Sequence, residues 1–199
     1  MVNAARPSRF QLLLLKWRIQ ACLTFGLKAR ALETIEEVLA LDPDNAHALA
    51  SRAHLRATDG DRGAAIADHR RLLAARADDA HAWFNLGFLL EQDGQLAEAE
   101  ATFRRAIELE PKLDRAWYGL GLALIRQHRY DDAVIALKRN TELQPMSPHG
   151  WYQLARVHVD RQQPDEAVKV IRHLKGFEPK VAAQLERETG LMAGPASER

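Results

Sequence analysis

The residues best suited to chemistry are histidines on expected helices, and their spacing offers one metal-binding arrangement. The chain has eight histidines and a single cysteine, Cys22. His47, His54 and His81 could face one groove, and imidazole nitrogens are common zinc ligands. Histidines seven residues apart on a polar helical stripe are more often plain surface residues, so we expect no metal site. Cys22 falls at an inward position, where a free thiol packs as a small apolar side chain.

Motifs that carry catalysis are missing from the sequence. It contains no Walker loop, dinucleotide-binding fingerprint, HExxH motif or nucleophile elbow. We therefore expect a protein that is not an enzyme, needs no cofactor and has no small-molecule substrate. The composition is that of a soluble folded protein, with 47% hydrophobic and 28% charged residues. A net charge of +1 gives no global signature of polyanion binding.

A fixed period of 34 residues organises the elements that must position any site. Alanine recurs at this spacing, at Ala31, Ala65, Ala99, Ala133 and Ala167. Such a period indicates a stack of one small repeated unit. In the copy at 80–113, apolar residues have helical spacing over 81–92 and again over 96–109, and Pro111 ends the second run. Each repeat is therefore predicted to be a helical hairpin.

The order of residue types within the repeat closely resembles the tetratricopeptide repeat (TPR). The clearest copy carries Trp83, Leu86, Gly87, Ala99, Phe103, Ala106 and Pro111, and the next two copies keep most of this order. The resemblance implies an all-α fold, a right-handed superhelical solenoid of helix-turn-helix hairpins. The small residues are expected to let helices approach closely, and the tryptophans to fill the space that the small residues leave.

Counting in steps of 34 predicts the domain organisation. We expect a flexible basic segment over 1–11, five repeats over 12–45, 46–79, 80–113, 114–147 and 148–181, and a capping helix with a disordered tail over 182–199. The first two repeats match the pattern least well. Arg18 and Arg52 stand where later repeats have leucine, and His69 replaces a bulky apolar residue. The second repeat is therefore predicted to be the weakest part of the stack.

The first 32 residues are locally basic, with six cations and no acid. One interpretation is attachment to an anionic membrane or to nucleic acid. The other, which we favour, is a terminal helix whose polar outward face is solvated.

The run Leu12–Leu15 before Cys22 also resembles a bacterial lipoprotein signal, but Lys16 and Arg18 interrupt the apolar run that such a signal needs. We expect a cytoplasmic protein, and the excess of arginine over lysine suggests a bacterial source.

The resemblance places function on the first helix of each hairpin, on the face that does not pack into the core. In this family, that face of the first helices lines the concave groove. Aromatic residues recur there with cations beside them. An apolar strip with a cationic border suits an extended or helical peptide that carries hydrophobic anchors and acidic groups. The expected partner-binding residues are His81, Phe84, Asn85, Phe88, Arg115, Tyr118, Leu122, Ile125, Arg126, His149, Tyr152 and Arg156.

These observations predict a non-catalytic adaptor that binds a protein or peptide in its concave groove. Several alternatives stay open: the aromatic residues could instead pack between adjacent first helices, and the same groove could serve a chaperone that shields an apolar segment of a secreted or assembling subunit. Nucleic acid and membrane are not expected partners, and a homo-oligomer remains open. Some relatives hold acidic chaperone tails with a carboxylate clamp. Of its expected positions, only Lys16 matches, which disfavours that ligand.

Overall fold

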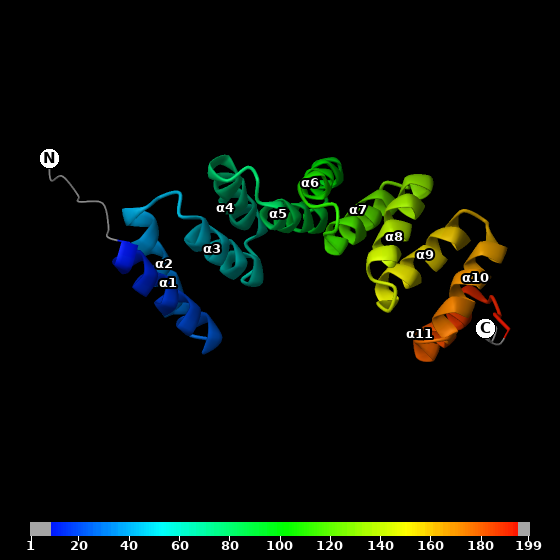
Figure 1. Ribbon diagram of the computed structural model, residues 1–199. Helices are drawn as coiled ribbons and strands as arrows, with labels where there is room; N and C mark the ends of the chain where they lie inside the picture. The colour runs from blue at the N-terminus through cyan, green and yellow to red at the C-terminus, as the bar shows by residue number, and fades with distance from the viewer. Residues whose placement is uncertain (1–8, 195–199) are drawn as a thin grey trace, which may run out of the picture. The chain divides into compact units, whose positions relative to one another are not determined.

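The computed structural model describes residues 9–194, and all regular secondary structure in that range is α-helical (Figure 1). Contacts divide the chain into two compact units, residues 1–93 and residues 94–199. Within each unit, consecutive helices pack against one another as hairpins. The all-α fold of helical hairpins expected from the sequence is therefore confirmed.

The first unit holds five helices within its described residues. They are α1 (Arg9–Thr24), α2 (Lys28–Leu41), α3 (Ala46–Thr58), α4 (Arg62–Ala75) and α5 (Ala80–Gln92). Side chains at Asn45, Asp61 and Asp79 cap the amino ends of α3, α4 and α5 by accepting hydrogen bonds from backbone N–H groups three residues on. These caps fix where the helices begin after each short loop.

The second unit holds six helices within its described residues. They are α6 (Leu96–Leu109), α7 (Asp114–Arg126), α8 (Tyr130–Leu143), α9 (Pro148–Asp160), α10 (Pro164–Lys175) and α11 (Pro179–Thr189). Helices α9, α10 and α11 each have proline in the first turn, where its missing N–H group costs nothing. Helix α11 packs against both α9 and α10 and so covers the last hairpin.

The turn within each hairpin repeats the same backbone conformation. Gly26, Gly60 and Gly94 have φ of 69°, 89° and 82°, which is the left-handed region. At the next two positions of the period, His128 and Gln162 adopt φ of 57°. The geometry of this turn is therefore kept even where the sequence no longer supplies glycine, which tolerates it best.

The two ends of the described chain differ from expectation. Residues 9–11, expected to be flexible, form the first turn of α1, because the helix-forming residues that follow extend the helix back to Arg9. At the other end, Ala193 is buried: its N–H donates to Glu186, and its carbonyl accepts from Lys175. Residues 190–194 are thus held against α10 and α11, not disordered. Residues 1–8 and 195–199 lie outside the described residues.

The periodic small residues lie at the centre of the packing. All five alanines of the 34-residue series are completely buried, and Cys22 is also buried, as expected. The repeat tryptophans Trp83, Trp117 and Trp151 differ from expectation because they are only half-buried. The indole N–H groups of Trp83, Trp117 and Trp151 donate to backbone carbonyls six residues earlier, at 2.9, 3.0 and 2.8 Å. They therefore fix the loop before each first helix, since an indole needs a partner for its N–H group.

The second repeat has a buried ionic network where later repeats have apolar contacts. Asp68 on α4 is 3% exposed. Arg52 on α3 donates to both of its oxygens, at 2.7 and 3.0 Å, and Arg56 donates to Oδ2 at 2.8 Å. Arg52 also reaches Glu36 on α2 at 2.9 Å. Arg52, at a position where later repeats have leucine, is thus neutralised by Asp68. The sequence pattern did not predict this ion pair.

His69 is a second polar residue in the core of this repeat. The residue is 6% exposed, and Nδ1 has no hydrogen-bond partner. Burial lowers the pKa of His69, because a charged imidazole is poorly solvated there, although Asp68 and Asp79 partly offset this effect. The folded chain therefore keeps His69 neutral at a pH where the unfolded chain protonates it.

We expect acid to destabilise the first unit through His69. An unfolded histidine takes up a proton near pH 6.5 and the buried one resists, so the free energy of unfolding should fall as pH drops below about 6.5. Replacing His69 with leucine, the residue at the equivalent position 137, should reduce this fall and raise stability at neutral pH. Urea unfolding at pH values above and below about 6.5 measures the free energy of unfolding of both proteins.

His54→Leu is the matched control, since His54 is exposed. Its pH dependence should equal that of the wild type. Some dependence should survive in His69→Leu, because burial and the nearby Lys16 also lower the pKa of His47. Equal acid sensitivity of His69→Leu and wild type would contradict the assignment.

Candidate functional site

In the first unit, the expected binding residues lie on α5 outside the packed core. Phe88 is 48% exposed, Phe84 is half-buried, and His81 and Asn85 are exposed. The rings of Phe84 and Phe88 stack with centroids 6.5 Å apart and planes inclined by 27°. This geometry is favourable for an aromatic pair and leaves ring surface open to solvent. The other side of α5 packs inward through Leu86 and Leu90.

In the second unit, α7 and α9 carry the remaining expected residues, and the packed core encloses none of them. Tyr118, Leu122 and Ile125 are half-buried along one side of α7, with Arg115 and Arg126 exposed. The opposite side of α7 supplies the core residues Leu120 and Leu124. On α9, Tyr152 is half-buried, and His149 and Arg156 are exposed. The stripe on α7 and α9 thus combines partly exposed apolar groups with cations.

Tyr152 on α9 contacts side chains of both α11 and its own helix. Its hydroxyl donates to Glu188 Oε2 on α11 at 2.5 Å, and the Arg156 guanidinium carbon lies 5.8 Å from its ring centroid. The hydrogen bond to the Glu188 carboxylate raises the pKa of Tyr152, and the same bond lowers the pKa of Glu188. The hydrogen bond stabilises the neutral phenol and the ionised carboxylate. At neutral pH the phenol therefore donates and the carboxylate accepts.

A cavity of about 410 Å³ lies beside this contact. Arg156, Val159, Asp160, Glu188 and Thr189 line it. Its lining therefore has one cation, two carboxylates, a hydroxyl and an aliphatic side chain. Such a lining can hydrogen-bond both positively and negatively charged groups of a bound segment.

Glu188 and Thr189 line the candidate site, and the sequence did not predict them. They belong to α11, whose position after the last repeat has no counterpart in the periodic pattern. The sequence predicts that a capping helix exists, but it does not predict which of its side chains reach α9.

The histidines first considered for metal binding are not brought together as a site. His54 is exposed, and His47 is half-buried with Nε2 lacking a hydrogen-bond partner. Within the described residues, no group of three or more histidine, cysteine or acidic side chains could hold a metal ion.

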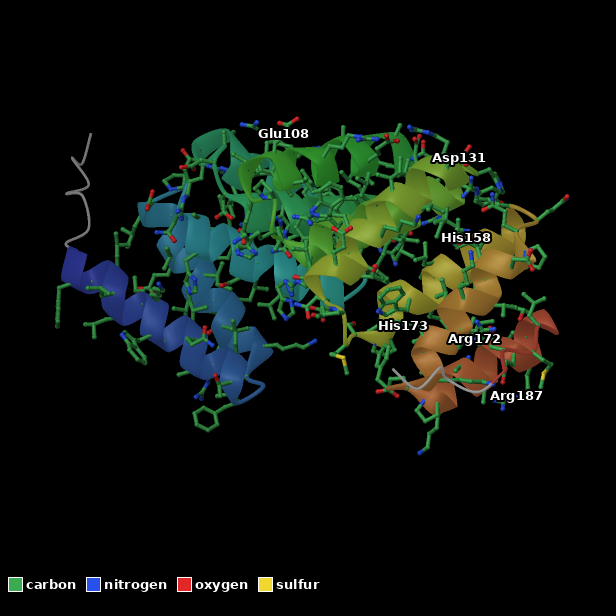
Figure 2. The ribbon with its side chains drawn as sticks, turned by 45° about the vertical axis from the view of Figure 1, so that its right-hand side comes forward. Glu108, Asp131, His158, Arg172, His173 and Arg187 are labelled. Atoms are coloured by element: carbon green, nitrogen blue, oxygen red, sulfur yellow. The ribbon has the colours of Figure 1, made fainter. Side chains whose placement is uncertain are left out.

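Two histidines in the second unit, both labelled in Figure 2, have structural contacts instead. His158 on α9 is 4% exposed, with Nδ1 3.0 Å from the Gln163 side-chain oxygen. The ring centroid of His173 on α10 lies 4.3 Å from that of Trp151 and 5.5 Å from that of Phe177. Each of these histidines thus fits a packing role.

Solved structures with this arrangement are TPR proteins, which defines the class of the fold. A crystal structure of MamA superposes with a TM-score of 0.78 and 21% identity, covering 92% of this chain and 97% of that one. YrrB, described as a TPR protein with an unusual peptide-binding site, gives 0.75 and 19%, covering 85% and 88%. PilF of Pseudomonas aeruginosa gives 0.71 and 20%, covering 88% of each chain.

The family follows from the sequence match. Residues 57–176, more than half of the chain, match the model of the Cilia and flagella-associated protein 70 middle TPR-like domain. The chain belongs to this TPR-like family. No curated protein matches the sequence at a significant level. Within residues 9–194, every helix is too short or too polar to span a bilayer.

Proposed function

We propose that the chain is a non-catalytic interaction scaffold that binds a segment of a partner protein on the exposed stripes of its first helices. One observation carries the proposal: on α5, α7 and α9, aromatic and aliphatic side chains remain partly exposed on the face that core packing does not use. Partly exposed apolar groups bordered by polar ones are typical of interaction surfaces. The described peptide-binding site of YrrB, which has the same fold, supports a peptide as the ligand.

The chemistry of the α7 and α9 stripe indicates what such a segment carries. Tyr118, Leu122 and Ile125 follow one another at spacings of four and three residues, which spans about 10 Å along α7. This suits two or three apolar anchors of an extended or helical peptide. Arg156 on α9 adds a cation for an acidic side chain.

The expected strength is that of a reversible interaction. Burying about 500 Å² of apolar surface at about 25 cal/mol/Å² contributes about 12 kcal/mol before costs. Ordering the peptide and losing its free motion offset several kcal/mol of this. The remainder corresponds to a dissociation constant on the order of micromolar.

Affinity capture from the source cell tests the proposal. We expect the triple variant Phe88→Ala, Tyr118→Ala and Tyr152→Ala to lose proteins that the wild type retains, because it removes the partly exposed rings. Ile135→Ala is the control: Ile135 is a large apolar residue on α8 that is 66% exposed, away from the stripes. Circular dichroism confirms that each variant is folded. If the triple variant and the wild type captured the same proteins, the stripes would not be the binding surface.

A further inference from the structure

The outward face of α1 is apolar, in contrast to the polar face expected of a terminal helix. Ile19 and Cys22 point into the core, with exposures of 0% and 9%. On the opposite side, the exposed fractions of four large side chains, Phe10, Leu13, Leu14 and Trp17, are 69%, 54%, 53% and 72%. At 3.6 residues per turn, these four fall within an arc of about 100°. The uninterrupted run Leu12–Leu15 causes this, since it places leucine on both sides of the helix.

This face does not have the shape that receives another hairpin of the same kind. The equivalents of Leu14 in the later repeats are buried small residues, at Ala48, Ala82, Ala116 and Gly150. Small size is needed there: a side chain carbon added at Gly150 would lie 2.1 Å from Asn140 on the preceding α8. Leucine at position 14 and tryptophan at position 17 prevent such a close approach to α1.

The charges around the face favour one kind of occupant. By helical geometry, exposed Lys16 and Arg18 lie on opposite flanks of the apolar arc, and Arg18 contacts the exposed Glu37 at 3.5 Å. Helix α1 itself carries no acid, and the acids that follow it in the sequence, Glu33, Glu36 and Glu37, are exposed on α2. A second copy of α1 would bring like charges to both flanks. An anionic surface would instead be attracted to both flanks while its interior accepted the apolar groups.

We propose that α1 lies flat in the interface of a membrane that contains anionic lipids. Phe10, Leu13, Leu14 and Trp17 enter the boundary between headgroups and acyl chains, and Lys16 and Arg18 extend sideways to the headgroups. The same two cations that interrupt a membrane-spanning or signal-like run are in the right places for a helix parallel to the surface. The proposal replaces the expectation that membranes are not a partner, and it does not depend on the peptide stripes.

Cosedimentation of the full chain with phosphatidylcholine vesicles, with and without phosphatidylserine, tests the proposal. We expect binding only when phosphatidylserine is present, and weaker binding as salt is raised. Leu14→Ala with Trp17→Ser, the residue types found at positions 48 and 51, should abolish binding without unfolding the chain, because both side chains are exposed. Lys16→Gln and Arg18→Gln should each weaken binding roughly fivefold. Ile135→Ala, an equally exposed apolar position on α8, should bind like the wild type.

Three outcomes would overturn the proposal. One is the absence of binding to the anionic vesicles, and another is equal binding by the wild type and the Leu14→Ala, Trp17→Ser variant. The third is a dimer, measured by sedimentation equilibrium without lipid, that this variant disrupts, because the apolar face would then be covered by a second copy.

Discussion

Replacing Asp68 with alanine is expected to destabilise the α3–α4 hairpin by about 3–5 kcal/mol. Asp68 is almost fully buried and accepts hydrogen bonds from Arg52 and Arg56. The Arg52 side chain is only 12% exposed, so the variant leaves its charge poorly solvated, with Glu36 as its nearest remaining acid. An uncompensated buried charge is among the most destabilising single changes in a protein core.

Restoring an apolar pair should rescue that loss. The fourth repeat holds Leu120 and Ala136 at the positions of Arg52 and Asp68, and both are buried. The double variant Arg52→Leu, Asp68→Ala should therefore lie within about 1 kcal/mol of the wild type or exceed it, since well-packed apolar residues often replace a buried ion pair without loss. Arg56, with 32% of its side chain exposed, can turn to solvent.

Hydrogen exchange of the amides in 46–75 measures the local stability of both variants, and urea unfolding measures their global stability. A double variant as unstable as Asp68→Ala alone would show that the carboxylate has a role beyond compensating Arg52.

Gly119→Ala is expected to destabilise the contact between α6 and α7 by about 1–2 kcal/mol. A carbon added at Gly119 would lie 2.6 Å from two ring atoms of Phe103, which is 1% exposed and cannot move into solvent. Overpacking of this kind costs about 1–3 kcal/mol, whereas alanine gains at most about 1 kcal/mol in helix propensity. The absence of a side chain at Gly119 thus makes room for the ring of Phe103.

A double-mutant cycle isolates this pair. One period later, Leu137 and Gln153 occupy the two positions, so a smaller residue at 103 should accommodate a larger one at 119. We expect Gly119→Ala to cost less in a Phe103→Leu background, with a coupling of about 1 kcal/mol. Gly63→Ala is the matched control, because a carbon added to this helical glycine meets nothing within 4 Å. Additive effects at 103 and 119 would contradict the size complementarity.

The regular part of the fold was predictable from sequence because the period imposes the same contacts in every repeat. The buried alanine series and the starts of α3, α5, α7 and α9 follow from one count of 34 residues. The pattern could not predict what happens where a repeat departs from it. Arg52 looked like a lost apolar contact, and only the fold brings Asp68 from α4 to its side.

For the candidate binding residues, the sequence predicted which side of each helix they occupy. Helical spacing placed the stripe residues on the side away from Leu86 and Leu120, and none of them is enclosed by the core. Two features lay beyond that reasoning. Glu188 contacts Tyr152 through a helix outside the repeat pattern. On the outer face of α1, Leu14 and Trp17 stand where every later repeat has a small or polar residue, and the repeat pattern does not predict such a departure.

The most direct test of the interaction-scaffold account is site-specific photo-crosslinking. A photoreactive phenylalanine analogue would be placed at Tyr118, at Tyr152 or, as the control, at Ile135 on α8. We predict that partner protein is crosslinked from positions 118 and 152 and not from 135. Crosslinking from 135 alone, with none from the two tyrosine positions, would contradict the account.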